Sequence, residues 1–297
     1  MENNPTVSVC MITYGHEKFI EQAIHGVLMQ ETSFEIELVI VNDCSPDATD
    51  LLVQDILINH PKASSIKYTK QQQNIGMMPN FVFALKECKG KYIALCEGDD
   101  YWTDPLKLQK QVNFLEANEE YVLCFHKVKI LKLNGELVDD FITNVPENYE
   151  TQETLARLGN YIHTPSVVFR NVIKVFPPEF SLSPIGDYFL YIQIVEFGKI
   201  KYLEEKMAVY RYGIGFFSGF DRSIKEKKWI KTLLLIISST KNETVKGILL
   251  NKLNQYFKLD NFELVVTNEG VFSRLKSLLI QFIPPIFFLL KNKLLKK

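Results

Sequence analysis

The chain has 297 residues, 46% hydrophobic and 23% charged, which is typical of a folded globular protein and excludes a disordered one. Its 34 Lys and Arg nearly balance 35 Asp and Glu, so no overall positive field would gather nucleic acid, and any phosphate binding must be local. The number of cysteines is odd, and the residues near the start of the chain lack the features of a signal peptide. We therefore expect reduced thiols and a cytoplasmic protein.

The first half of the chain alternates short apolar runs with amphipathic segments, which is the pattern of parallel strands joined by crossover helices. The predicted strands are residues 7–12, 36–41, 66–69 and 92–96. The predicted helices are residues 17–30, a segment ending near 59, residues 79–88 and a segment from Asp104-Pro105 to 117.

From about residue 119 the pattern becomes mixed. Asn134-Gly135 predicts a hairpin between residues 121–133 and 136–142. Further elements predicted in chain order are a strand from 163 to 170, a helix from 186 to 198, a strand over 200–211, a glycine-rich loop at Gly213, Gly215 and Gly219, and helices from about 223.

Polar residues follow three of the predicted strands. They are Thr13-Tyr14, Asp43, and the run from Glu97 to Asp100. If these strands are parallel and adjacent, the three groups meet where ligands bind in open α/β sheets. Two consecutive carboxylates repel each other unless a cation compensates, and Mg²⁺ or Mn²⁺ prefers such ligands. In an extended chain, one of Asp99 and Asp100 would hold the metal and the other would reach a ribose. The alternative is a solvated turn.

Four segments together resemble the family 2 glycosyltransferases of the GT-A fold, over roughly residues 5–212. The segments are residues 7–14, 41–49, 74–76 (Asn74-Ile75-Gly76) and 90–100. The resemblance implies an α/β protein with a Rossmann-like nucleotide-binding mixed sheet flanked by helices, followed by a C-terminal helical extension.

The resemblance also implies an activity. Such enzymes transfer a sugar, with inversion, from a nucleotide-diphosphate sugar, commonly a UDP-sugar, using Mg²⁺ or Mn²⁺. The acceptor would be a hydroxyl of a saccharide or lipid-linked saccharide, in bacterial surface polysaccharide or glycolipid synthesis. The implied donor contacts are Thr13, Tyr14, Asp43, Asn74 and Asp99; the implied metal ligands are Asp100 and Glu97; the implied base is Asp187.

Some features depart from the resemblance or leave alternatives open. Glu97 stands where many members carry Asp, and no His follows the strand ending at Arg211. Arg211 either approaches the diphosphate or is structural. His163 either lies on the acceptor side or is structural. Trp102 either stacks on a sugar or, as we favour, packs the loop against the helix.

We predict a catalytic domain over residues 1–220, with about 1–118 binding the donor and about 119–220 forming the acceptor side, and a helical extension over 221–297. Residues 277–290 are apolar and basic-flanked, but they are too short to span a membrane and are interrupted by Pro284-Pro285. Residues 274–297 would therefore lie on the inner face of the cell membrane, or dock on the protein's own core or on a second subunit.

Two other functions compete with this interpretation. One is a nucleotidyltransferase-like enzyme, although the glycine-rich basic loop usual after its first strand is missing. The other is a non-catalytic protein that binds a sugar nucleotide, and the acidic residues Asp43, Asp99, Asp100 and Asp187 argue against it.

Overall fold

The computed structural model describes residues 5–215 and 219–259. The chain divides into two compact units, Met1–Leu249 and Leu250–Lys297, and the first unit contains the sheet. The predicted boundary near residue 220 stays a prediction.

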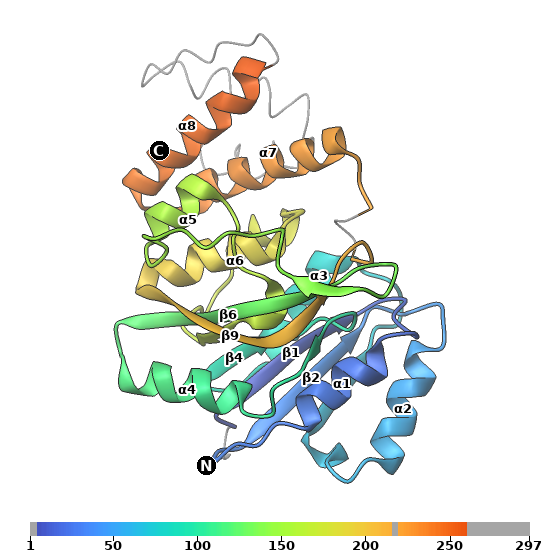
Figure 1. The fold of residues 1–297 in the computed structure, drawn as a ribbon. Coiled ribbons are helices and arrows are strands. Elements are labelled where there is room, and N and C mark those ends of the chain that lie inside the picture. The colour runs from blue at the N-terminus through green and yellow to red at the C-terminus, as the bar shows by residue number, and fades with distance from the viewer. Residues whose placement is uncertain (1–4, 216–218, 260–297) are drawn as a thin grey trace. The chain divides into compact units, whose positions relative to one another are not determined.

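The first unit is built on a mixed nine-stranded sheet (Figure 1). The strand order is β3-β2-β1-β4-β8-β6-β9-β5, with β7 paired to β6. The strands are β1 (Val7–Thr13), β2 (Ile36–Asn42), β3 (Ile66–Lys70), β4 (Tyr92–Leu95), β5 (Tyr101–Trp102), β6 (Tyr121–Leu131), β7 (Leu137–Asp139), β8 (Val168–Arg170) and β9 (Lys199–Arg211). The first four strands are parallel, β6 is parallel to β9, and β8 runs antiparallel between β4 and β6.

Helices cover both faces of this sheet. In Figure 1, α1, α2 and α4 lie on one side, and α3, α5 and α6 on the other. The helices are α1 (Ile20–Leu28), α2 (Thr49–Asn59), α3 (Met77–Glu87), α4 (Lys107–Ala117), α5 (Gln152–Leu158), α6 (Gly186–Ile194), α7 (Arg222–Ser239) and α8 (Glu243–Leu259). The main core lies between β1, β2 and β4 and the apolar faces of α1 and α4. The predicted α/β class is therefore confirmed.

Two elements were missed by the sequence analysis. Strand β5 has only two residues, and it becomes a strand because it pairs with β9 more than 100 positions later. Helix α5 carried a local signal: the Thr151 hydroxyl accepts a hydrogen bond from the Thr154 N–H, and Gly159 follows the helix with φ +93°.

Among the boundaries that differ from the prediction, two have a local cause. Helix α4 begins at Lys107, because Asp104 and Pro105 form a turn in which the Asp104 carboxylate accepts the Leu106 N–H at 2.8 Å. The predicted strand from residue 163 begins only at Val168, after a 3₁₀ turn over Thr164–Ser166 that contains Pro165.

The carboxyl ends of several strands meet at one edge. Thr13 pairs with Asn42, and the Gly98 N–H donates to the Ile12 carbonyl, so the chain beyond β4 still follows β1. The end of β9 joins them, since the Arg211 N–H donates to the Asp100 carboxylate. Because β8 and β6 lie between β4 and β9 in the strand order, this contact requires the sheet to curl.

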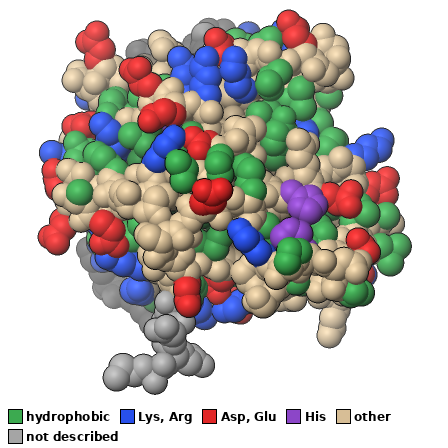
Figure 2. Space-filling model, turned by 60° about the horizontal axis from the view of Figure 1, so that its bottom comes forward, with side chains coloured by type: hydrophobic (Ala, Val, Ile, Leu, Met, Phe, Trp, Pro, Cys, Tyr) green, Lys and Arg blue, Asp and Glu red, His purple; other side chains and the backbone are tan. Residues whose placement is uncertain are grey.

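The remaining expectations concern membrane contact, surface charge and the state of the cysteines. In residues 5–215 and 219–259, no helix is both long and apolar enough to cross a membrane, and segment 274–297 lies outside the described residues. Figure 2 shows Lys, Arg, Asp and Glu side chains mixed over the face it presents. All five cysteines are free, and only Cys44 is not buried.

Candidate active site

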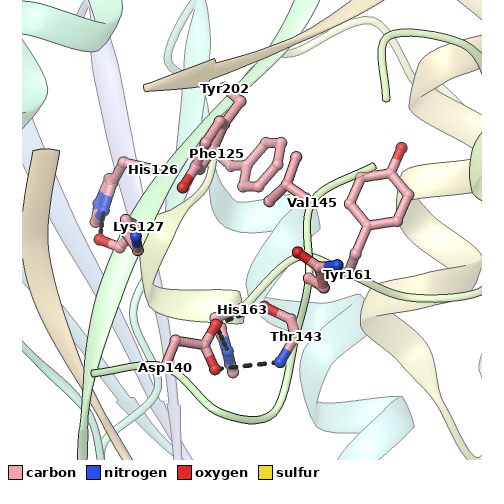
Figure 3. Close-up of a pocket in the computed structure, with 10 residues that line it drawn as sticks. Phe125, His126, Lys127, Asp140, Thr143, Val145, Tyr161, His163 and Tyr202 are labelled. Carbon is pink, nitrogen blue, oxygen red and sulfur yellow. Dashed lines mark hydrogen bonds and ion pairs between the residues drawn. The ribbon is translucent and has the colours of Figure 1, made fainter. Parts of the chain in front are cut away.

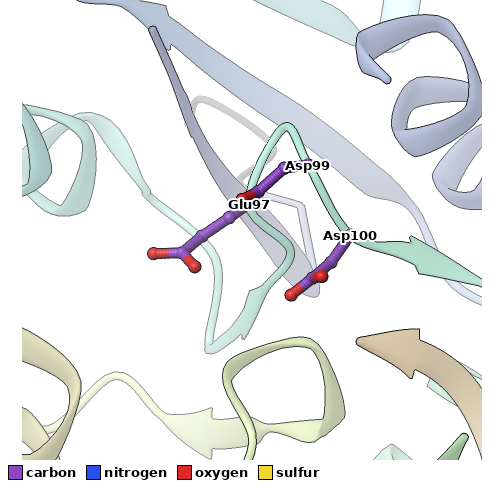
Figure 4. A group of neighbouring side chains, drawn as sticks. All are labelled: Glu97, Asp99 and Asp100. Atoms are coloured by element: carbon purple, nitrogen blue, oxygen red, sulfur yellow. The ribbon is translucent and has the colours of Figure 1, made fainter. Parts of the chain in front are cut away.

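An acidic turn connects β4 to β5 (Figure 4). The Asp100 N–H donates to the Glu97 carbonyl at 3.1 Å, which closes the turn. The sequence analysis expected Asp99 and Asp100 on an extended chain with opposed side chains. Instead, the turn gathers carboxylate oxygens of Glu97, Asp99 and Asp100 within 4.8 Å of one another.

Not every carboxylate oxygen of this cluster has a partner in the described part of the chain. Asp100 is 1% exposed, and its Oδ2 is buried without a hydrogen-bond partner among the described residues. Burial, followed by the Asp99 charge, raises the pKa of Asp100 well above its usual range. Burial and the charges of Asp99 and Asp187 raise the pKa of Glu97 to about 8. An orphaned carboxylate oxygen beside two further carboxylates is the donor set that a hard divalent cation fits.

The end of β1 lies directly against this turn. Thr13 is buried and its Oγ1 lies 3.2 Å from Nδ1 of His16, while Nε2 of His16 lies 4.0 Å from Oδ2 of Asp99. The side chain of Tyr14 is 48% exposed, so its ring is free to receive a ligand. The sequence analysis missed His16, because no metal-ligand spacing relates it to the other histidines, and only the fold brings it to Asp99.

Gly98 makes this close approach possible. A Cβ at position 98 would lie 2.7 Å from Oγ1 of Thr13 and 2.8 Å from Nδ1 of His16. These separations are too short for a carbon atom. The glycine therefore sets the spacing between β1 and the acidic turn.

Asp43 organises a second loop at the same edge. Its N–H donates to the Thr13 carbonyl at 3.0 Å, and its carboxylate accepts the N–H groups of Ile75 at 2.7 Å and Gly76 at 2.9 Å. The Asn74 carbonyl oxygen Oδ1 also accepts the Gly76 N–H, at 3.0 Å. Asp43 thus ties the Asn74 loop to the end of β2, and each of its oxygens keeps a second lone pair for a ligand.

Asp187 lies in the first turn of α6. Nδ2 of Asn160 donates to its Oδ2 at 2.7 Å, and burial raises the pKa of Asp187. The Asp187 charge is one of the causes that raise the pKa of Glu97, so the two carboxylates lie within electrostatic reach of each other. Asn160 had no sequence signal, because the contact spans 27 positions that include β8 and the loops on either side of it.

Arg211 packs against the acidic turn and contacts it with its side chain. Its guanidinium lies between the rings of Phe19 and Tyr101, 4.8 Å and 4.7 Å from their centroids. It donates to the Asp99 carbonyl and to Oε1 of Gln22. Of the two alternatives for Arg211, this geometry favours the structural one.

The other two ambiguous residues are also held by the fold. Nε1 of Trp102 donates to the Pro165 carbonyl at 2.8 Å, and the Lys107 ammonium lies 4.1 Å from the Trp102 ring, so this side chain packs the loop. Nε2 of His163 lies 3.0 Å from Oδ2 of Asp140.

Comparison with known sequences gives a consistent family match. The model of "Glycosyl transferase family 2" matches residues 8–176. The uncharacterised protein Rv1520 of Mycobacterium tuberculosis is 37% identical over 206 residues, which cover 69% of this chain and 58% of that protein. A Bacillus subtilis glycosyltransferase named for a proposed role in teichuronic acid biosynthesis, TuaG, is 31% identical over 51% of this chain and 57% of its own length. The chain thus spans about 58% of the length of its mycobacterial relatives.

Solved structures share the architecture. TarS of S. aureus in complex with UDP-GlcNAc superposes with a TM-score of 0.63 at 18% identity, covering 85% of this chain and 73% of that one. The mannosyltransferase PcManGT of Pyrobaculum calidifontis, in complex with GDP-Man and Mn²⁺, gives a TM-score of 0.59 at 16% identity, covering 85% and 70%. At these identities the likeness concerns the fold, and the GT-A architecture predicted from the sequence is confirmed.

Proposed function

The chain belongs to glycosyl transferase family 2, and we propose that it transfers a sugar, with inversion, from a nucleotide-diphosphate sugar to an acceptor hydroxyl. The observation that carries this proposal is the meeting of the acidic turn with Thr13 and Asp43 at one sheet edge, with Asp187 within electrostatic reach of Glu97.

The nucleoside would lie over the ends of β1 and β2. We assign Thr13, Tyr14 and Asp43 to the nucleoside, with Asp43 accepting a hydrogen bond from the base, and Asn74 to the same site through its loop. Exposure of the Tyr14 ring and the free lone pairs on Asp43 support this assignment. A uridine nucleotide is our choice of donor, and Asp99 would contact its ribose or the sugar.

A divalent cation, Mg²⁺ or Mn²⁺, fits the acidic turn. Asp100 would be its principal ligand through the orphaned Oδ2, with Glu97 as a second. When bound, the ion would offset negative charge on the diphosphate leaving group. Arg211 keeps this turn in place through the Asp99 carbonyl and the Asp100 carboxylate.

Asp187 would act as the base of a single displacement. The acceptor oxygen forms a bond to the anomeric carbon as the bond from that carbon to the diphosphate oxygen breaks, and the hydroxyl proton passes to Asp187. A raised pKa makes this carboxylate a stronger base, and Asn160 fixes its orientation. Attack from the side opposite the leaving group inverts the anomeric carbon.

We further propose that the acceptor belongs to a bacterial surface polysaccharide or glycolipid. The name of TuaG refers to such a polymer, and a lipid-linked acceptor would bring residues 274–297, with their basic flanks, to the inner membrane surface. The sequence leaves docking of this segment on the core or on a second subunit as the alternatives.

One experiment tests the proposal as a whole. The protein is incubated with UDP-, GDP- or dTDP-sugars, with Mg²⁺, with Mn²⁺ or with a chelator, while release of the nucleoside diphosphate and the melting temperature are recorded. We expect metal-dependent stabilisation and slow hydrolysis with UDP-sugars. NMR of the released sugar should show the opposite anomer. Stabilisation without any hydrolysis would instead support a binding protein, and release of pyrophosphate a nucleotidyltransferase.

A further inference from the structure

The structure contains a cavity of about 220 Å³ whose lining residues include none of the acidic turn's carboxylates (Figure 3). Its walls come from β6, from the segment after β7, from residues 161–163 and from β9. Of these residues, only His163 has been considered above, with the acceptor side or a structural role as its alternatives. The cavity is smaller than the roughly 300–1,000 Å³ of pockets for drug-sized ligands, so it suits a group the size of one sugar ring.

One wall of the cavity is aromatic. The Phe125 ring lies 6.1 Å from that of Tyr161 and 5.0 Å from that of Tyr202. Phe125 and Tyr161 are buried, whereas Tyr202 is partly exposed, so its ring is the one open to a ligand. Within the described residues the Tyr202 hydroxyl makes no hydrogen bond, and it remains available as donor and acceptor.

The opposite wall is polar, and its Asp140 carboxylate already has several hydrogen-bond donors. The Asp140 carboxylate accepts the N–H groups of Ile142 and Thr143, at 2.8 Å and 3.1 Å, and the Thr143 hydroxyl at 2.5 Å. With His163 it forms a pair 3.0 Å apart. Burial alone would raise the pKa of Asp140, but the hydrogen bonds from His163 and Thr143 outweigh burial and lower it. A carboxylate that already accepts this many hydrogen bonds does not need a cation to balance its charge. The cavity therefore does not fit a metal ion or a cationic ligand.

The cavity also lies next to Asp187. Asn160 donates to Asp187, and the following residue, Tyr161, lines the cavity. Burial raises the pKa of Asp187, and the His163 charge is among the influences that oppose it, which places His163 within electrostatic reach of that carboxylate. The adjacent residues Asn160 and Tyr161 therefore link Asp187 to the wall of the cavity.

We propose that this cavity is the acceptor subsite, and that it holds one sugar ring against Tyr202 with the Asp140–His163 pair facing the hydroxyl groups. Apolar ring faces suit the aromatic wall, and hydroxyl groups can both donate to and accept from His163, Tyr202 and Asn144. This inference rests on the proposed function, since the ring held here would carry the hydroxyl that Asp187 activates.

The test uses the full chain and simple probes. Methyl glycosides of glucose, galactose, mannose and N-acetylglucosamine are added to the protein, and binding is followed by saturation-transfer NMR. We compare the native protein with Tyr202→Leu, which removes the wall, and with Asn144→Trp, which fills the cavity from an exposed loop without disturbing the core. Tyr121→Leu is the matched control: another half-buried tyrosine, on β6, whose ring packs on Phe114 away from the cavity.

We expect at least one glycoside to bind the native protein and Tyr121→Leu, with affinity about tenfold lower in Tyr202→Leu and lost in Asn144→Trp. Donor binding, followed as metal-dependent stabilisation by UDP-sugars, should be the same in both cavity variants as in the native protein, because the acidic turn is untouched. If no glycoside binds the native protein, or if Asn144→Trp binds as well as the native protein, the subsite assignment is wrong. Absence of donor hydrolysis in the native protein would instead count against the proposed function, so the two failures are distinguishable.

Discussion

The backbone N–H of Arg211 donates a hydrogen bond to Oδ1 of Asp100 at 2.8 Å, across 111 positions of sequence. The same arginine uses its side chain to hold the Asp99 carbonyl. One residue at the end of β9 therefore fixes both aspartates of the acidic turn, although it has no place in the donor contacts we propose.

Arg211→Lys should weaken both stability and donor binding. Lysine cannot reach the Asp99 carbonyl and Gln22 together, nor stack flat between Phe19 and Tyr101. We expect a loss of about 2 kcal/mol in the free energy of unfolding, measured in urea, together with weaker metal-dependent donor binding. Arg222→Lys, at an exposed position on α7, should change neither. Unchanged donor binding in Arg211→Lys would mean that the turn holds its shape without the guanidinium.

Gly98→Ala should separate β1 from the acidic turn. The added methyl group would lie 2.7 Å from Oγ1 of Thr13, so either the turn or the strand end must move. We expect lower donor affinity and a lower melting temperature, because both sides of the proposed donor site shift. Gly247→Ala in α8, where no atom of the described residues outside the helix's own backbone and the adjacent residues lies within 4 Å of the added carbon, should raise stability by about 0.5–1 kcal/mol. Donor affinity equal to that of the native protein would show that the spacing at Gly98 is unimportant.

Lys107 should make stability depend on pH. It is completely buried against Trp102 and Gln111, and burial lowers its pKa to about 7. The unfolded chain, with an ordinary lysine pKa near 10.4, binds more protons between these two values. The penalty for burying the charge is therefore complete below pH 7 and is relieved as pH rises toward 10.

Lys107→Met removes this penalty and should be compared with the native protein at pH 6.5 and pH 9. We expect the native protein to gain about 1–3 kcal/mol relative to the variant over that range, measured by urea unfolding. The lost hydrogen bond to Gln111 lowers stability equally at both pH values and so does not affect the difference. Lys86→Met, at an exposed position on α3, is the control and should show no such trend. A native–variant difference that is independent of pH would contradict the lowered pKa.

The elements of the first half were predictable, because each carries its own periodicity. Strands β1, β2 and β4 are continuous apolar runs, and α1 has a clear apolar face. The alternation of strands and helices along the chain therefore predicted the sheet edge at which Thr13, Asp43 and the acidic turn meet. Strand β5 was missed because two residues carry no periodicity and β9 alone makes them a strand.

The shape of the acidic site could not be predicted in the same way. A tight turn and an extended chain accommodate Glu97 to Asp100 equally well by sequence, and the choice is made by the Asp100 contact with Arg211. Likewise, the His16 contact with Asp99 and the Asn160 contact with Asp187 depend on loops whose course no local pattern records.

Substitutions of Asp100 and Asp187 should separate donor binding from sugar transfer. In Asp100→Asn, the amide oxygen can still accept the Arg211 N–H, so the turn keeps its shape while one negative ligand is lost. We expect metal-dependent stabilisation by UDP-sugars to disappear. In Asp187→Asn, the donor site is intact, but no carboxylate is present to take the acceptor proton. We expect normal donor stabilisation and transfer slowed by about 10²–10⁴-fold.

A structural role for Asp187 makes a different prediction. Carboxylates at helix N-termini stabilise the helix dipole, and on that account Asp187→Asn would merely lower stability. Asp221, which caps α7 by accepting the Ile224 N–H at 2.9 Å, provides the matched comparison. Asp221→Asn should change stability by a similar small amount and leave transfer unaffected, because asparagine caps helices as well as aspartate does. If Asp187→Asn retains full transfer and differs from the native protein only as Asp221→Asn does, Asp187 is a helix-terminal carboxylate and the base must be sought elsewhere.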